Sequence, residues 1–170
     1  MDNFKILLVD DSQNMLKALK RTFISEGYAL YFSLSAKEAL EILKKEDIDL
    51  IISDENMPEI SGTDLLKLVR VQYPSMIRIM LTGLADFEVV KNAINKGEIY
   101  KFFNKPWDDF ELLLSVRYAL KQKVLEKENQ QLKSKLRTQE EYLRQLELEY
   151  PGISEKKMSK DGSIIIDNGN

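Results

Sequence analysis

Residues 4–108 alternate short apolar segments with stretches of helical periodicity. Each apolar segment is three to six residues long, which is the length of a buried strand rather than of a helix. The predicted strands cover 4–9, 28–33, 50–52, 76–81 and 99–103. Between them, apolar residues recur every three or four positions, as they do on amphipathic helices. Regular alternation of this kind requires crossover connections, so it predicts an α/β fold whose parallel sheet is covered on both faces.

Serine residues mark the predicted starts of two helices. Ser12 can cap the first helix, and Ser35 with Glu38 three residues later forms a capping-box pattern at the second. Helices are also predicted over 63–73 and 86–95, and a fifth begins at Asp108. The helix over 63–73 is expected to bury Leu65, Leu66, Leu68 and Val69. The helix that begins at Asp108 is expected to bury Leu113, Val116, Leu120 and Val124.

The chain of 170 residues contains neither histidine nor cysteine. This excludes Ser–His and Cys–His catalysis, disulfides, and metal sites built on thiolate or imidazole, and the chain itself cannot carry phosphohistidine. The net charge of −3 offers no argument for nucleic-acid binding. No apolar run is long enough to span a membrane, and the N-terminus lacks a signal-peptide pattern, so we expect a cytoplasmic protein without membrane attachment.

Polar residues gather where the predicted strands end. Asp10 and Asp11 follow the first strand, Asp54 the third, Thr82 the fourth and Lys105 the fifth. Because the carboxyl ends of parallel strands share one edge, these side chains should lie close together. Three carboxylates repel unless a cation joins them, and Mg²⁺ prefers such oxygen ligands. A lysine and a hydroxyl are groups that hold phosphoryl oxygens, so the pattern predicts phosphorylation of a carboxylate, with Asp54 as the candidate.

These residues resemble the receiver domains of two-component response regulators. The likeness covers about residues 4–121, and it rests on Asp10-Asp11, Asp54 with Met57-Pro58 and Gly62, Thr82-Gly83, and Lys105-Pro106. It implies a flavodoxin-like (βα)₅ receiver over residues 1–121 with the parallel sheet order 2-1-3-4-5. It also implies a response regulator that performs only its own phosphotransfer and autodephosphorylation and is not an enzyme acting on a free substrate.

The resemblance assigns the phosphorylation chemistry to five residues. Asp54 would accept the phosphoryl group from a sensor histidine kinase or a phosphotransfer protein. Asp11, Asp54 and the backbone carbonyl of Asn56 would bind Mg²⁺, and Asp10 would act largely through a bound water. Lys105 would bind the phosphoryl group, and its bond to the following proline would be cis.

The resemblance also implies a conformational switch made of Thr82 and Phe102. Thr82 would move towards the phosphoryl group, and Phe102 would follow it inward. Many receivers carry tyrosine where this chain has Phe102, so no hydroxyl is available here for a partner; a plain core role in the fifth strand is the alternative. Glu55 and Leu84 occupy positions whose side chains tune water access to the phosphate.

A heptad pattern continues the fifth helix over residues 122–150. Positions d are Leu125, Leu132, Gln139 and Leu146, and positions a are Asn129, Leu136, Leu143 and Tyr150. Opposite charges pair at g and e: Lys121 with Glu126, Glu128 with Lys133, and Lys135 with Glu140. This arrangement favours a parallel two-stranded coiled coil and hence a homodimer. The alternative is a single solvated helix laced with charges.

Residues 151–170 are predicted to form a short β element or a disordered tail. No output domain is recognisable after the heptads, so output is expected through an unknown partner. Alternatively, the chain is the receiver part of a larger regulator with a cyclic-dinucleotide phosphodiesterase or transcriptional output domain, as the segment 97–108 suggests. A haloacid-dehalogenase-type phosphohydrolase would need Asp-x-Asp after the first strand, which Asp10-Asp11-Ser12 lacks. A DNA-binding role would need a basic region, which the long helix lacks.

Overall fold

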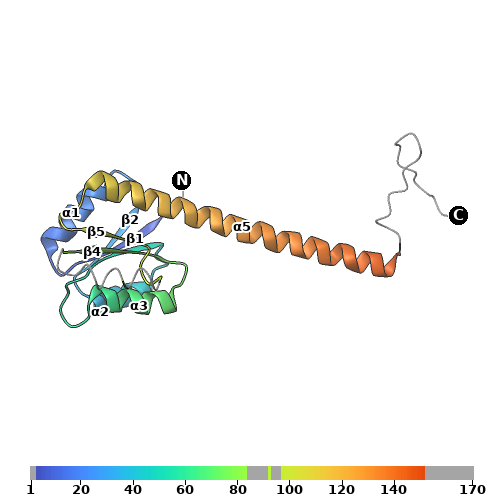
Figure 1. Cartoon of the computed structure of the whole chain (residues 1–170), viewed down its shortest axis with the longest axis horizontal. Helices are drawn as coiled ribbons and strands as arrows, with labels where there is room; N and C mark the ends of the chain where they lie inside the picture. Colours follow the sequence, from blue (N-terminus) through green and yellow to red (C-terminus); the bar gives the residue numbers. More distant parts are fainter. Residues whose placement is uncertain (1–2, 84–91, 93–96, 152–170) are drawn as a thin grey trace. The chain divides into compact units, whose positions relative to one another are not determined.

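The computed structural model describes residues 3–83, 92 and 97–151. Five strands form one parallel sheet: β1 (Lys5–Val9), β2 (Ala29–Ser33), β3 (Leu50–Asp54), β4 (Ile77–Thr82) and β5 (Lys101–Asn104). The strand order is β2-β1-β3-β4-β5 (Figure 1), which confirms the predicted flavodoxin-like topology. Apart from Asn92, the helix predicted over 86–95 lies outside the described residues, as do Leu84 and the predicted tail after Pro151.

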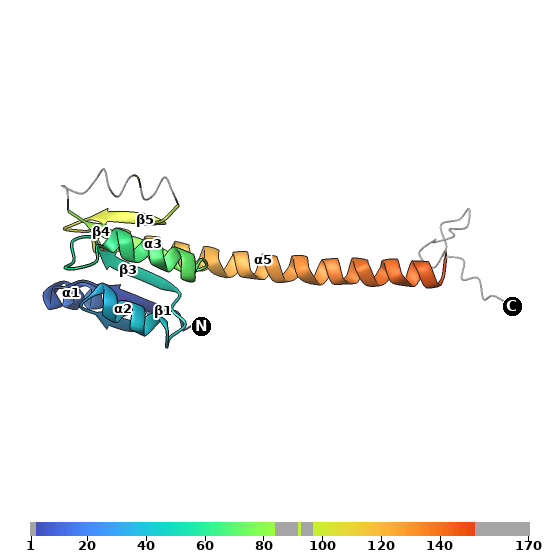
Figure 2. The same ribbon diagram turned by 90° about the horizontal axis from the view of Figure 1, so that it is seen from below.

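Helices cover both faces of this sheet (Figures 1 and 2). On one face lie α1 (Gln13–Phe23) and the first part of α5 (Asp109–Glu149). On the other face lie α2 (Ala36–Leu43) and α3 (Gly62–Gln72). Every residue of β3 is buried, because this central strand has neighbours on both edges and helices on both faces. The site acid at its end therefore projects from the most rigid part of the domain.

Most of the predicted details of these helices are confirmed, and the burial of Leu68 is wrong. Ser35 accepts a hydrogen bond from the Glu38 amide and caps α2, as predicted. Val69 is buried, whereas Leu68 is 42% exposed, because it lies beside the face of α3 that Leu65, Leu66 and Val69 turn to the core. Ser12 occupies the N-cap position of α1 but makes no side-chain capping hydrogen bond.

The buried stripe of α5 is also shifted from the predicted one. Leu112 is fully buried and Leu113 is only partly so, while Val116 and Leu120 are buried as predicted. A shift of one residue turns a helix by about 100°. The face that α5 presents to the sheet is therefore set by packing against α1 and the strands, which the apolar spacing alone did not resolve.

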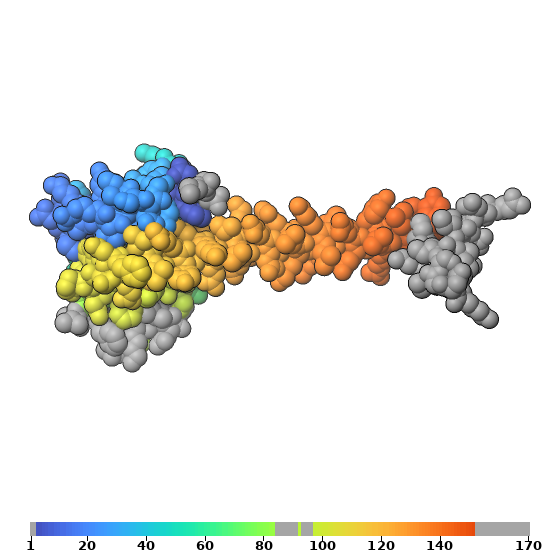
Figure 3. Space-filling view, turned by 90° about the horizontal axis from the view of Figure 1, so that it is seen from above, coloured from blue at the N-terminus to red at the C-terminus, as the bar shows by residue number. Residues whose placement is uncertain are grey.

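The chain divides into two compact units after Val124. The second unit contains the rest of α5, and the side chains of the heptad residues Leu125, Leu132, Leu136 and Leu143 are each more than half exposed there. Figure 3 shows this part of α5 in orange, with its side chains open to solvent on the visible face. Among the described residues, no helix combines the length and the apolar character that crossing a membrane requires.

Candidate functional site

Backbone hydrogen bonds join the carboxyl ends of neighbouring strands: β1 to β2, and both β3 and β5 to β4. The Asp10 amide donates to the carbonyl of Ser33 after β1 (3.1 Å), and the Glu55 amide donates to the carbonyl of Leu81 after β3 (3.0 Å). The Lys105 amide donates to the carbonyl of Thr82 after β5 (2.8 Å). These bonds extend the ladders by one residue past the strand ends. The predicted site residues are thereby held at one edge of the sheet.

Asp10, Asp11 and Asp54 form a cluster of carboxylates at this edge. One oxygen of each lies within 4.8 Å of the others, with Asp10 and Asp54 buried and Asp11 exposed. Oxygens that share one Mg²⁺ at about 2.1 Å are at most about 4.2 Å apart, so small side-chain movements suffice to place all three on one ion. The all-oxygen donor set and the exposed Asp11 fit Mg²⁺, which keeps some of its waters.

Lys105 lies between the two buried acids. Its Nζ is 2.7 Å from Oδ1 of Asp54 and 2.9 Å from Oδ2 of Asp10. The peptide bond from Lys105 to Pro106 is cis, as the sequence resemblance implied. The second oxygen of Asp10 accepts a hydrogen bond from the Ser12 amide (2.8 Å), so Asp10 is held at both oxygens. The turn that begins α1 therefore also orients Asp10.

Burial and charge act in opposite directions on the central ion pair. Burial raises the pKa of Asp54 above its ordinary value, and the hydrogen bond and positive charge of Lys105 only partly offset that rise. Burial alone would lower the pKa of Lys105, but its hydrogen bonds to Asp54 and Asp10 outweigh burial and raise it. Lys105 therefore favours the ionised carboxylate of Asp54, the form able to attack an electrophile.

Thr82 and Phe102 occupy the two strands beside the acidic cluster. Thr82 is the last residue of β4 and is fully buried, and its hydroxyl donates to the carbonyl of Gly83 (3.1 Å). Phe102 lies in β5 opposite Met80 and packs, partly buried, against the core between the sheet and α2 and α3. The structure thus places Thr82 next to the acids and Phe102 further back along the neighbouring strand.

The loop from Glu55 to Ser61 connects the acceptor strand to α3. Asn56, predicted to offer its carbonyl to a metal, is exposed in this loop. Glu55 is only 7% exposed, and its carboxylate accepts hydrogen bonds from Thr63 in the first turn of α3. No expectation from the sequence included this contact. The sequence does place an acid shortly before a predicted helix and a threonine in its first turn, and helix N-termini attract carboxylates, so the pattern could have indicated the contact.

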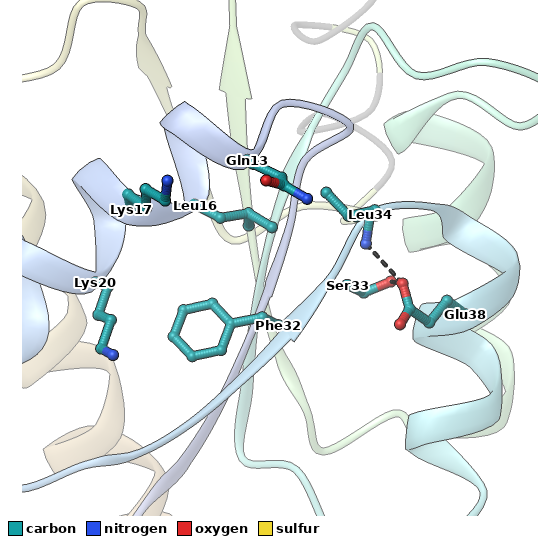
Figure 4. Close-up of a pocket in the computed structure, with 8 residues that line it drawn as sticks. All are labelled: Gln13, Leu16, Lys17, Lys20, Phe32, Ser33, Leu34 and Glu38. Atoms are coloured by element: carbon teal, nitrogen blue, oxygen red, sulfur yellow. Dashed lines mark hydrogen bonds between the residues drawn. The ribbon is translucent and has the colours of Figure 1, made fainter.

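Two surface hollows lie near this edge of the sheet. One, of about 340 Å³, lies between α1, β2 and α2, and its eight lining residues do not include any predicted site residue (Figure 4). Its acid, Glu38, accepts hydrogen bonds from the Leu34 amide and from the Ser33 hydroxyl. The other hollow, of about 530 Å³, is lined by α1 residues together with Pro106, Trp107 and Asp109. It therefore adjoins Lys105 in the chain.

Comparison with known proteins identifies the same region. The family model for the response regulator receiver domain matches residues 6–117. The hydrogenase transcriptional regulatory protein HoxA of Cupriavidus necator is 35% identical over 140 residues, which cover 82% of this chain and 29% of HoxA. The transcriptional regulatory protein GlrR of Escherichia coli is 35% identical over 117 residues, 69% of this chain and 26% of GlrR.

Solved structures agree with the sequence relatives. The signal receiver domain of an HD domain-containing protein from Pseudomonas fluorescens Pf-5 is 42% identical, with a TM-score of 0.68, and the match covers 71% of this chain and 97% of that one. A response regulator receiver domain protein from Clostridium thermocellum is 30% identical, with a TM-score of 0.68 and coverage of 72% and 98%. The chain spans only 29% of HoxA and 26% of GlrR, so these relatives include much that it does not match.

Proposed function

The chain belongs to the family of response regulator receiver domains, and we propose that Asp54 is its phosphoacceptor. The observation that carries this proposal is the position of Asp54 within one cluster with Asp10, Asp11 and Lys105. The proposed donor is a phosphohistidine of a sensor kinase or phosphotransfer protein, since receiver domains interact with such proteins; the chain itself has no histidine to carry the group. The hollow beside Pro106 and Trp107 is a suitable place for that donor to approach.

In the proposed phosphoryl transfer, Asp54 is the nucleophile, and the other site residues position the reacting groups and neutralise charge. A carboxylate oxygen of Asp54 forms a bond to phosphorus while the bond from phosphorus to the donor's imidazole nitrogen breaks, and the electron pair leaves with the imidazole. Lys105, now paired with Asp54, would turn its ammonium to a phosphoryl oxygen and offset the charge gained there. Bound Mg²⁺, held by Asp11, Asp54 and the Asn56 carbonyl, with Asp10 through a water, would neutralise the remaining phosphoryl charge.

The acyl phosphate then biases a two-state surface. Thr82 would exchange its present hydrogen bond to the Gly83 carbonyl for one to the phosphoryl group, and Phe102 would move inward behind it. Attack of water on the acyl phosphate releases inorganic phosphate and resets the switch. The reaction is self-directed, and we assign the protein to the cytoplasm, with output through a protein partner rather than by direct contact with nucleic acid.

Covalent phosphorylation tests this proposal directly. After incubation with acetyl phosphate and Mg²⁺, the intact mass should increase by one phosphoryl group, because the acidic cluster with bound Mg²⁺ and Lys105 can hold a small phosphodonor against Asp54. Removal of Mg²⁺ with EDTA should abolish the increase, since the repulsion between three carboxylates and the phosphodonor is then not neutralised. A protein that gains no phosphoryl group, or gains it equally well in EDTA, would contradict the proposal.

The heptads support a second part of the proposal, a parallel homodimer through residues 122–150. The side chains of Leu125, Leu132, Leu136 and Leu143 are exposed in the single chain, while the charges at g and e are complementary between two copies of the same helix. An isolated helix of this length with an exposed apolar seam gains stability by pairing. The output partner would then meet two receivers. The alternative, a receiver that forms part of a larger regulator, agrees with the names of the transcriptional relatives.

Lysine substitutions in the seam should convert a dimer into a monomer. The double variant Leu132→Lys/Leu136→Lys buries two charges in the interface, so its mass by light scattering should be half that of the unchanged chain. The control Gln131→Lys/Thr138→Lys adds the same charge at two c positions outside the seam and should remain dimeric. An unchanged chain that is already monomeric at micromolar concentration would refute the dimer.

A further inference from the structure

The acid that follows the phosphoacceptor is directed away from it. Oε2 of Glu55 accepts two hydrogen bonds from Thr63, one from the amide (2.8 Å) and one from the hydroxyl (2.8 Å). Both residues are buried. Thr63 is the second residue of α3, so the carboxylate lies against the positive end of that helix. Burying a carboxylate costs free energy of folding unless hydrogen-bond donors compensate it. The two donors of Thr63 provide that compensation for Glu55.

The backbone of Glu55 also holds the loop of residues 56–62, which connects β3 to α3. The carbonyl of Glu55 accepts hydrogen bonds from the amides of Met57 (3.2 Å) and Gly62 (3.0 Å). Its own amide is bound to β4 through Leu81. Glu55 therefore joins the end of β3, the neighbouring strand β4 and the start of α3, and its contacts help to close the loop that carries Asn56.

The loop held by these contacts contains a strained residue. Glu59 has φ of 68°, a left-handed conformation that non-glycine residues adopt at a cost in free energy. Such a conformation persists only where the surrounding contacts determine it. The bonds of Glu55 to Thr63 and Gly62 are contacts of that kind, since they close the loop at the helix end.

We propose that Glu55 is a positioning residue for the metal site: its bonds to Thr63 hold the 56–62 loop so that the Asn56 carbonyl faces the acidic cluster. This inference rests on the proposed phosphoacceptor function. It differs from the sequence-based interpretation of Glu55 as a residue that tunes water access, because the observed carboxylate is engaged with α3. Removing the carboxylate should then weaken Mg²⁺ binding although Glu55 does not touch the ion.

The test uses the full chain and three substitutions. Glu55→Leu removes the acceptor, Thr63→Val removes one of the two donors, and Glu55→Gln keeps an acceptor oxygen without the charge. Mg²⁺ affinity is measured by calorimetry in the absence of any phosphodonor. The Kd should rise at least about tenfold in Glu55→Leu, the range typical for loss of a residue that orients a metal ligand. Thr63→Val should be intermediate, and Glu55→Gln should recover most of the affinity.

A matched control separates positioning from a general loss of stability. Thr22→Val removes another largely buried threonine hydroxyl, which donates to Asp109 (2.6 Å) in contact with α5. It should lower the Tm yet leave the Mg²⁺ affinity unchanged. Amide hydrogen exchange over residues 56–63, recorded without Mg²⁺, should be faster in Glu55→Leu and unchanged in Thr22→Val.

Three results would overturn the inference: folded Glu55→Leu with unchanged Mg²⁺ affinity, an equal loss in Thr22→Val, or unchanged exchange in the loop. If Glu55→Leu does not fold, an unaltered Mg²⁺ affinity in Thr63→Val overturns it as well. Failure of the proposed function is a separate result. It would appear as an unchanged chain that binds Mg²⁺ but takes up no phosphoryl group, while the variants still lose Mg²⁺ affinity.

Discussion

Asp54→Asn is expected to abolish covalent phosphorylation by acetyl phosphate and to leave the chain folded. The side-chain amide has nearly the shape of the carboxylate, but it carries no negative charge and is a far weaker nucleophile. Lys105 keeps its second partner, since its Nζ also lies 2.9 Å from Asp10. Intact mass after incubation with Mg²⁺ should therefore show no phosphoryl adduct, while circular dichroism remains that of the unchanged chain.

The matched control for this substitution is Asp47→Asn, which alters an exposed aspartate in the segment before β3. It removes the same charge at a distance from the cluster and should be phosphorylated normally. A folded Asp54→Asn chain that takes up a phosphoryl group as fully as Asp47→Asn would show that another residue is the acceptor. Asp10 and Asp11 would then be the next carboxylates to replace.

Gly62→Ala should both destabilise the receiver unit and impair phosphorylation. A Cβ at Gly62 would overlap the backbone carbonyl oxygen of Asp54 and lie 2.9 Å from Cα of Glu55. Neither neighbour is the flexible end of a side chain, so α3 must move away from β3. Overpacking of this kind costs about 1–3 kcal/mol and sometimes more. Urea denaturation should show this loss, and the rate of phosphorylation by acetyl phosphate should fall.

Gly27→Ala is the control for this prediction. Gly27 has φ of 75°, so alanine is strained there, yet a Cβ would meet no atom within 4 Å. The left-handed backbone costs an alanine roughly 1–2 kcal/mol. This variant should thus lose stability without any change in the phosphorylation rate of the folded chain. Equal phosphorylation rates in Gly62→Ala and Gly27→Ala would show that the close approach of α3 has no part in shaping the site.

The residues of the site that lie at the carboxyl ends of strands could be predicted from the sequence. Asp10, Asp11, Asp54, Thr82 and Lys105 were placed together because parallel strands deliver their carboxyl ends to one edge, and the structure brings these residues to that edge. The coiled-coil partner and the metal role of Asn56 stay predictions. Both depend on a second chain or an ion rather than on the spacing of residues within this chain.

The errors in the predicted core concern single side chains of helices, whose burial depends on how each helix is rotated about its axis. Leu65, Leu66 and Val69 in α3 and Val116 and Leu120 in α5 are buried as predicted, whereas Leu68 is exposed and Leu113 is only partly buried. Ser12 is the N-cap residue of α1, as predicted, but its side chain makes no capping hydrogen bond. The Ser12 amide bonds to Asp10, so that turn is shaped by the site it supports and not by helix capping alone.

The sequence by itself determined the order of strands and helices and the set of acids at the strand ends. The order of the elements along the chain follows from the local spacing of apolar residues. The grouping of the acids follows because the crossover connections between parallel strands bring their carboxyl ends to one edge of the sheet. Only the tertiary structure decided how Lys105 is shared between two acids and how Glu55 reaches Thr63. The contact between Glu55 and Thr63 depends on the distance between β3 and α3, which is set by packing across the core and by the absent side chain of Gly62. The sharing of Lys105 depends instead on how closely the ends of β1, β3 and β5 approach one another.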